Sequence, residues 1–467
     1  MTLDPHPFFD RPLLERMRAP ALWFVVALAV FCAFAGERLK GPSPHNHFVY
    51  LADSYLHGTL ELRGEPPHHN DWATVTEITL ASGEELSGIW WDRSAREFLD
   101  LEGDRYRIDA HDMRGMRTSH RHYVSFPPMP AVLMMPGVAV LGFSFPDVLF
   151  TLLFAAMNVA LVFTLLRRVQ LGGRSRLQPL DVHWLTGLFA FGTNHLWCSV
   201  QGTVWFTALV IGVTFTLAYV HCAIDAKRPF WAGVFLACAF ATRTPLLFST
   251  VFFAAYFFFP QGRFREDFGA RFWRDGIRFA IVPLIVGCLL MAANHARFGS
   301  LTEFGHTYLA YGQIDRIKHY GLFNVHFLTR NLLSMFVQLP QLLPREPYVV
   351  ISNHGLALWV TSPALFWLMK APAEHSPVDR LYRRACWVTV AAIALPHIFY
   401  QNTGWVQFGY RFSMDYIAYL TLLLALTLTR LGWGFRLATL IGVGVNVFGA
   451  MIFDRVPRHF GEWFLEP

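Results

Sequence analysis

The sequence predicts an all-α polytopic membrane protein with about eleven transmembrane helices and a small β-rich insert in the first outer loop. Hydrophobic residues make up 54% of the 467 residues, and charged residues only 15%. Several apolar runs approach the ~20 residues that a helix needs to cross ~30 Å of hydrocarbon. The net charge of +6 comes mostly from short loops between these runs. No basic soluble face is evident, so nucleic acid is not expected as a partner.

Eleven apolar segments are the candidate spans. They cover roughly residues 20–35, 146–166, 182–197, 204–223, 229–242, 245–259, 279–293, 355–370, 386–400, 415–429 and 436–452. The segment 126–142 is short and broken by prolines, so we expect an interfacial or re-entrant helix there. This divides the chain into an N-terminal span with a first-loop helix (1–61), an extracytoplasmic β-rich insert (62–122) and a transmembrane core (123–467) with outer loops 294–354 and 401–414.

The insert shows strand signals separated by turn signals. The runs ATVTEITL, LSGIWW, EFLDL and RYRIDA are short and rich in β-branched and aromatic residues. Ser82-Gly83 and Glu102-Gly103-Asp104 lie between them and are typical of turns. A small, solvated β-module is therefore expected.

The basic residues indicate the orientation of the spans. Arg and Lys cluster in 1–19, 167–181, 224–228, 260–278, 370–385 and 430–435, on alternate sides of the predicted spans. The positive-inside rule places these pieces in the cytoplasm, together with the N-terminus. We expect a multi-pass protein of the bacterial inner membrane whose active face is outside.

A polar stripe marks the segment 45–58, HNHFVYLADSYLHG. Asn46, Tyr50, Asp53 and His57 fall at i, i+4, i+7 and i+11, which places them on one side of a helix. A short helix of this kind can lie in the membrane interface with its polar stripe toward a cavity. An ordinary amphipathic connector helix is the plainer alternative. His47 belongs to the same segment.

Arg243 is the most informative single charge, because it lies between two short apolar runs and is followed by Pro245. A guanidinium at membrane depth costs at least ~2.5–3.5 kcal/mol and so needs an anionic partner. Phosphate suits its bidentate geometry, whereas snorkelling to headgroups or pairing with a protein carboxylate are the alternatives. Arg411 and Asp415 are one turn apart and are expected to form an ion pair, although Arg411 could still face a ligand.

The Cys and His residues show no strong metal-binding motif anywhere in the sequence. The six cysteines stand singly, so neither a disulfide framework nor a cysteine zinc site is indicated. The twenty histidines form no HExxH motif, and the pairs His68-His69 and His120…His122 are at most surface ligands. We predict no metal site and no certain cofactor, with a divalent metal left open.

Four segments together resemble the GT-C superfamily of polytopic glycosyltransferases, which includes protein O-mannosyltransferases and lipid A aminoarabinose transferases. The first outer loop carries N-x-x-V-Y with Gly58 after it, and FPPMPAVLMMP is similar to the family's Pro-Pro interfacial helix. CAFATRTP resembles a hairpin whose tip carries Lys or Arg. NHARFGSLTEFGHTYL, which contains Glu303 and His306, resembles the family's "RFGsp" segment.

The resemblance implies transfer of a sugar from a polyprenyl-phosphate donor to a glycan, lipid or protein acceptor, with inversion. Arg243 would neutralise the leaving phosphate, and Arg411, His47, Tyr50 and His306 would complete the donor site. The family usually has a catalytic Asp where this sequence has Asn46, and an amide cannot act as a general base. Asp53 is then the candidate base and Glu303 the reserve, or catalysis is altered or lost.

A second class of function competes with the enzyme. A non-catalytic transporter or lipid flippase would use Arg243 as a charge on a substrate path through a water-filled cavity. Such proteins commonly consist of repeated halves with paired broken helices near the midplane. No repeat of this kind is evident in the sequence.

Overall fold

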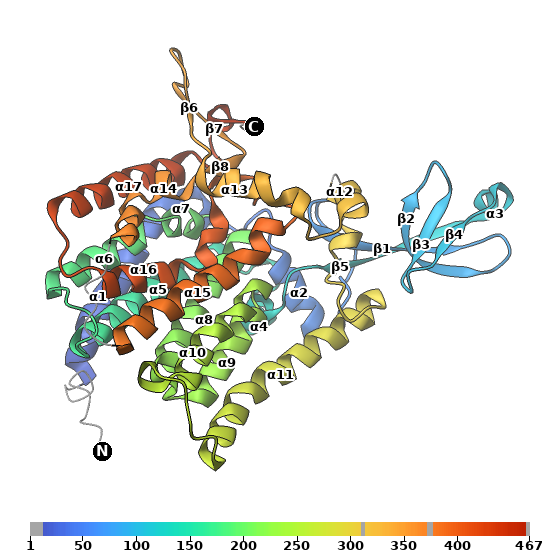
Figure 1. Ribbon diagram of the computed structural model, residues 1–467. Coiled ribbons are helices and arrows are strands. Elements are labelled where there is room, and N and C mark those ends of the chain that lie inside the picture. The colour runs from blue at the N-terminus through green and yellow to red at the C-terminus, as the bar shows by residue number, and fades with distance from the viewer. Residues whose placement is uncertain (1–12, 310–312, 371–376, 464–467) are drawn as a thin grey trace. The chain divides into compact units, whose positions relative to one another are not determined.

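The computed structural model describes residues 13–309, 313–370 and 377–463, which are mostly helical (Figure 1). The first twelve residues, which the sequence predicts to face the cytoplasm, lie outside the described residues. The chain divides into two compact units. Unit 1 comprises 1–45, 146–283 and 325–467, and unit 2 comprises 46–145 and 284–324. Each unit is described by itself.

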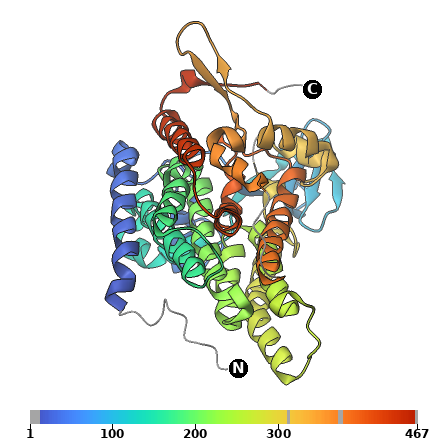
Figure 2. The same ribbon diagram turned by 60° about the vertical axis from the view of Figure 1, so that its left-hand side comes forward.

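Unit 1 is a bundle of helices in which α1 packs along α5 at the edge (Figures 1 and 2). Helix α8 packs against both α5 and α9, and α15 against both α10 and α16. The longer helices are α1 (Leu13–Ala35), α5 (Asp147–Leu171), α6 (Pro179–Phe191), α8 (Val204–Ala223), α9 (Pro229–Phe240), α10 (Thr250–Phe258), α13 (Leu328–Phe336), α15 (Pro377–Phe399), α16 (Ile417–Thr427) and α17 (Trp433–Ile452).

Short elements connect these helices and carry many of the polar residues of unit 1. The helical pieces are η1 (Gly36–Lys40), α7 (His195–Ser199), η3 (Ile224–Ala226), η4 (Thr244–Ser249), η5 (Pro260–Gly262), η7 (Val325–Phe327), α14 (Leu358–Thr361), η8 (Pro363–Met369), η9 (Arg411–Asp415) and η10 (Pro457–His459). The strands are β6 (Gln341–Leu342), β7 (Val349–Ser352), β8 (His354–Leu356), β9 (Gln407–Gly409) and β10 (Phe460–Gly461). They form two small sheets, β10-β7-β6 and β8-β9.

Among the described residues, five helices are long and apolar enough to cross a membrane, not the eleven expected. They are Met17–Lys40, Asp147–Leu171, Val204–Ala226, Ala270–Phe298 and Trp433–Ile452. The presence of these helices supports the prediction that the chain is a membrane protein. Helices α9, α10 and α16 have only 12, 9 and 11 residues, about 14–18 Å at 1.5 Å per residue.

The difference has a physical reason. Hydropathy counts apolar side chains but does not distinguish those that face lipid from those that face protein. Almost every residue of α16 is buried, so its apolar character reflects a protein core. The expected span 355–370 is interrupted by Ser362-Pro363 and consists of β8, α14 and η8. Irregular backbone at membrane depth is tolerated where protein surrounds it.

Unit 2 begins with α2 (His47–Leu56), the polar-striped segment of the sequence. Its buried residues include Phe48, Leu51 and Ala52, the apolar side of the stripe, and Gly58 follows at a φ of 72°. A left-handed residue just beyond the last turn is a common way to end a helix. Helix α2 packs against α4 (Met129–Leu141), which occupies the proline-rich segment and leads into η2 (Gly142–Ser144).

The expected strands of the insert form one antiparallel sheet of order β4-β3-β2-β1-β5 (Figure 1). The strands are β1 (Trp72–Thr79), β2 (Glu85–Asp92), β3 (Glu97–Asp100), β4 (Arg105–Arg107) and β5 (Arg117–Val124), with α3 (Ala110–Gly115) before the last. Strand β1 lies between β2 and β5 and pairs Thr76 with Gly88 on one side and with His120 on the other.

Two apolar clusters support this sheet. Ile78, Leu86 and Phe98 belong to a cluster made by the insert alone. Val75 and Tyr123 instead pack with residues that follow the insert by more than 170 positions, namely Phe298, Tyr308 and Leu309. The later segment of unit 2 contains the C-terminal part of α11 (Ala270–Phe298), η6 (His306–Tyr308) and α12 (Gln313–Tyr320). The sheet therefore shares part of its core with this later segment.

Candidate functional site

Arg243 lies at the tip of a helical hairpin in unit 1. Helix α9 ends at Phe240, and η4 begins at Thr244 with Pro245 at its second position. Arg243 itself is extended, with φ −149° and ψ 115°, because it serves as the residue before the new helix. Its side chain is 16% exposed, so the guanidinium is mostly but not fully enclosed.

The partner of Arg243 is Asp415, at the end of η9. Nε of Arg243 donates to Oδ1 over 2.5 Å and Nη2 donates to Oδ2 over 2.8 Å, a bidentate ion pair between residues 172 positions apart. Asp415 is fully buried, and Nε2 of His397 lies 2.9 Å from Oδ2. Asp415 thus takes Arg243 and His397 as ion-pair partners, whereas the sequence suggested Arg411.

Three cationic or protonatable side chains converge on the ring of Phe412. His397 stacks on it at 4.7 Å between ring centroids, with planes 12° apart. The guanidinium carbons of Arg243 and Arg411 lie 5.7 Å and 5.8 Å from its centroid. Both residues that the sequence proposed as phosphate ligands in this region therefore belong to one cluster, which we call the Arg243 centre (Arg243, His397, Arg411, Phe412 and Asp415).

The contacts of Asp415 leave part of Arg243 available. Nη1 of Arg243 makes no hydrogen bond with any residue that the structure describes. Because Asp415 holds the other two nitrogens, the guanidinium plane is fixed. A fixed N–H pair on a partly exposed Arg is suited to an anionic oxygen.

Hydrogen bonds from Asn194 hold the turn that carries Arg411. The Asn194 amide donates to the carbonyl of Tyr410 over 2.9 Å and to Oγ of Ser413 over 3.0 Å. Its oxygen accepts from the indole of Trp197 over 3.0 Å. The backbone N–H of Arg411 donates to the side chain of Gln407 over 2.8 Å. These buried bonds fix the backbone on which the Arg243 centre depends.

In unit 2, the first of the residues proposed from the sequence is Asn46. It precedes α2, and its carbonyl accepts the first bond of the helix, from Val49 over 2.8 Å. Its side chain makes no capping bond. The residue is only 9% exposed, and its amide has no hydrogen-bond partner among the described residues. A nearly buried amide without a partner is costly unless a ligand or water satisfies it.

Asp53 follows on the same helix with its side chain 14% exposed. Its carboxylate lies 3.5 Å from Nδ1 of His57 and 3.6 Å from Nη1 of Arg63. Both distances exceed hydrogen-bond length, so the carboxylate is paired loosely. Arg38 and Lys40, the partners that charge and proximity in the sequence would favour, instead contact Asp454 and Glu37.

The other proposed residues of unit 2 have local structural contacts. His47 is buried, stacks on Trp72 at 4.0 Å, and places Nε2 2.9 Å from the carbonyl of Asn70. Tyr50 stacks on Phe143 at 4.6 Å.

The remaining two proposed residues are Glu303, in the loop before η6, and His306, at the start of η6. The Glu303 carboxylate accepts from the N–H of Gly305 over 2.6 Å and from the hydroxyl of Thr307 over 2.7 Å, which closes the loop. His306 begins η6 within it.

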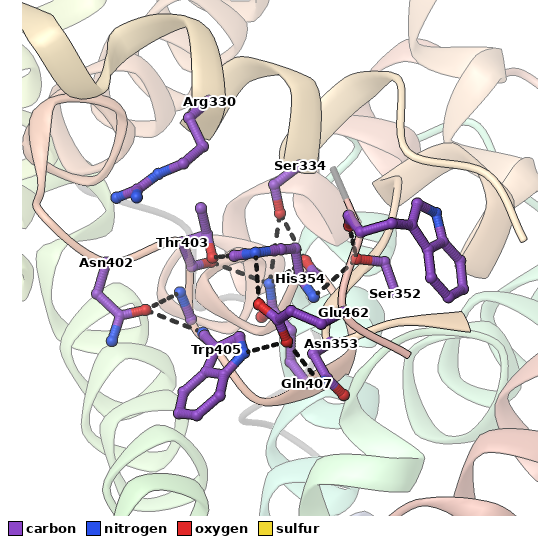
Figure 3. A network of polar contacts seen from close by, with 12 residues as sticks. Arg330, Ser334, Ser352, Asn353, His354, Asn402, Thr403, Trp405, Gln407 and Glu462 are labelled. Carbon is purple, nitrogen blue, oxygen red and sulfur yellow. Dashed lines mark hydrogen bonds and ion pairs between the residues drawn. The ribbon is translucent and has the colours of Figure 1, made fainter. Parts of the chain in front are cut away.

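A second polar network in unit 1 is satisfied by its own members (Figure 3). Oε2 of Glu462 accepts from Asn353 over 2.7 Å and from the indole of Trp405 over 3.0 Å. Oε1 lies 3.4 Å from Nε2 of His354, whose Nδ1 is 2.8 Å from the hydroxyl of Thr403. The network joins the last described residues to β7, β8 and the 401–406 loop. The network therefore holds the last described residues against these elements of unit 1.

The structure thus brings Arg243 and Arg411 together, and places Asn46, His47, Tyr50, Asp53, Glu303 and His306 in unit 2. The role of His397 was not predicted. A histidine 18 residues before a buried carboxylate gives no local signal, because α15 and η9 meet only in the folded chain.

Among the described residues, no group of three or more His, Cys, Asp or Glu side chains is arranged to hold a metal ion. Comparison with models of known families, with curated proteins and with solved structures finds no match to this chain.

Proposed function

We propose that this protein is a membrane glycosyltransferase that takes a sugar from a polyprenyl-phosphate donor on the outer face of the bacterial inner membrane. The observation that carries the proposal is the guanidinium of Arg243. Asp415 holds it through Nε and Nη2, and Nη1 makes no hydrogen bond with the residues that the structure describes. A fixed guanidinium donor stabilises negative charge that develops on a leaving phosphate.

The reaction balances without a cofactor. The acceptor hydroxyl oxygen attacks the anomeric carbon, the bond from that carbon to the phosphate oxygen breaks, and polyprenyl phosphate leaves with the electron pair. The hydroxyl proton passes to a carboxylate, for which Asp53 is the candidate and Glu303 the reserve. Attack opposite to the leaving group inverts the anomeric carbon. Asn46 supplies a hydrogen-bonding amide rather than a base.

Donor binding to purified protein in nanodiscs tests the phosphate role. The single substitution Arg243→Gln removes the guanidinium that would bind the phosphate. It also leaves Asp415 buried beside His397 without its arginine partner, which costs ~3–5 kcal/mol of stability. The double variant Arg243→Gln/Asp415→Asn replaces both charges by amides and is expected to recover much of that stability. If Arg243 binds phosphate, the double variant still binds a polyprenyl-phosphate sugar at least about tenfold more weakly, the loss of one charge-assisted bond.

Arg174→Gln is the matched control. Arg174 also makes a two-bond ion pair, to Asp225 over 2.8 and 2.9 Å, and has a similarly enclosed side chain. The variant Arg174→Gln should lower stability without changing the affinity for the sugar donor. Equal donor binding by the double variant and wild type would reduce the Arg243 pair to a structural role. Movement of the intact donor across the bilayer without sugar transfer would favour a flippase.

A further inference from the structure

A cavity of about 430 Å³ lies at the connection between α16 and α17 in unit 1. Its lining comes from this connection and from the end of η8, and includes Trp367, Lys370, Thr427, Arg430 and Gly434. Thr427 is the last residue of α16, and Asp415 lies two residues before the first. Eleven helical residues, about 16 Å, therefore separate the cavity from the Arg243 centre. The two sites are distinct.

Two cations without a carboxylate partner line the cavity. Lys370 places its ammonium 5.6 Å from the ring centroid of Trp367, and Arg430 is exposed. Neither side chain forms an ion pair with any residue that the structure describes. Arg174 and Arg436, in the same unit, pair with Asp225 and Asp181. Among the described residues, no carboxylate therefore compensates the positive charge that the cavity presents.

A threonine whose hydroxyl makes no hydrogen bond with the described residues also lines the cavity. Thr427 is 8% exposed, and its side chain has no hydrogen bond within the described chain. Threonines at other helical positions of unit 1, such as Thr421 and Thr439, donate to the carbonyl four residues earlier. Thr427 does not make this bond, so its hydroxyl is free for a ligand oxygen.

The start of α17 adds backbone donors to the same wall. Helix α17 has 20 residues, and no side chain caps its N-terminus at Gly432. The first N–H groups of a helix lack intrahelical acceptors and carry partial positive charge. Together with two cations and a free hydroxyl, they form an arrangement that suits a phosphate group.

The position of the cavity relative to the apolar helices favours a lipid over a soluble anion. It lies where the apolar helix α16 ends and the candidate span Trp433–Ile452 begins, which is the level of lipid headgroups. Trp433 is 75% exposed at that end, as aromatic residues at membrane interfaces commonly are. Leu428 and Phe435 add apolar lining beside the polar groups. We propose that this cavity binds the phosphate headgroup of an anionic phospholipid.

Native mass spectrometry of the full chain tests the proposal, with phosphatidylglycerol as the probe and phosphatidylcholine as the zwitterionic comparison. Wild type should retain phosphatidylglycerol at least tenfold more tightly. Lys370→Ala/Arg430→Ala should lose that preference, and Thr427→Val, which keeps shape but removes the hydroxyl, should weaken it severalfold. Arg263→Ala/Arg271→Ala removes the same charge from exposed positions outside the cavity and should leave it unchanged.

Three results would overturn the proposal. The first is equal retention of the two lipids by wild type. The second is an equal loss in both double variants, which would make the effect one of net charge. The third is binding of inorganic phosphate as tight as that of phosphatidylglycerol and equally sensitive to Lys370→Ala/Arg430→Ala, which would assign the cavity to a soluble anion.

Discussion

Two carboxylates proposed from the sequence have very different surroundings. Asp415 is fully buried and held by two bonds from Arg243, so protonating it would break a buried ion pair. Asp53 is 14% exposed and lies more than 3.4 Å from both His57 and Arg63. A general base must accept a proton and release it in each cycle. The loosely paired Asp53 suits that role, and Asp415 suits the orientation of Arg243.

Asp53→Asn should lower turnover by about 10²-fold or more, since this is a typical share of general-base catalysis, while donor affinity stays unchanged. A sugar-transfer assay on purified protein measures this, with folded protein quantified in each sample. Glu303→Gln is the comparison, because Glu303 closes its own loop through Gly305 and Thr307 and should mainly affect stability.

The reverse pattern, with turnover lost in Glu303→Gln and kept in Asp53→Asn, would move the base to Glu303. A lower melting temperature with unchanged turnover of the folded fraction would make Asp53 structural.

The surroundings of His122 lead us to expect that the β-sheet of the insert is less stable at acidic pH. Burial lowers the pKa of His122, although Glu65 beside it acts in the opposite direction. Below pH ~6.5 the unfolded chain binds a proton that the folded chain resists, so stability falls as pH falls through this range. Hydrogen exchange of β1 and β5 from pH 8 to 5 measures the effect. His122→Gln should flatten the pH dependence, and an unchanged slope in that variant would exclude His122 as the cause.

At the scale of elements, the β-sheet depends on two cores of different origin. Phe98 is fully buried in the cluster that the insert makes by itself. Phe298 is 1% exposed in the cluster that joins β1 and β5 to the later segment of unit 2. The sheet was expected to be a separable module, but one of its two cores includes residues outside the insert. An excised 62–122 fragment would also end before Tyr123 and Val124 of β5.

Substitutions in the two cores should therefore loosen different strands. Phe98→Ala and Phe298→Ala each remove a large buried side chain, at a cost of about 3–5 kcal/mol. Hydrogen exchange should show lost protection mainly in β2 and β3 for Phe98→Ala, and mainly in β1 and β5 for Phe298→Ala. Identical exchange patterns in the two variants would mean that the sheet unfolds as one unit with a single core.

At the scale of the whole molecule, charge predicts the orientation of the spans. Basic loops alternate with polar ones along the sequence, and the five candidate spans include one at each end of unit 1, α1 and α17. By the positive-inside rule we expect the insert outside and the 167–181 connection in the cytoplasm.

Cysteine labelling of spheroplasts tests this orientation, in a background where the exposed Cys288 is replaced by Ser. Glu84→Cys, at an exposed turn of the insert, should react with a membrane-impermeant reagent on intact cells. Arg176→Cys is equally exposed and should react only after permeabilisation. Reaction of Arg176→Cys alone on intact cells would invert the topology and place the Arg243 hairpin on the cytoplasmic face.

Local patterns in the sequence determined the strands of the insert, the α2 helix and the need of Arg243 for an anionic partner, because alternation, helical periodicity and an isolated charge are readable from neighbouring residues. Of the eleven predicted spans, five correspond to helices that are long and apolar enough to cross a membrane among the described residues. Only the tertiary structure decided that Asp415 pairs with both Arg243 and His397. The pair with Arg243 joins segments 172 positions apart in the chain, so packing alone selects it.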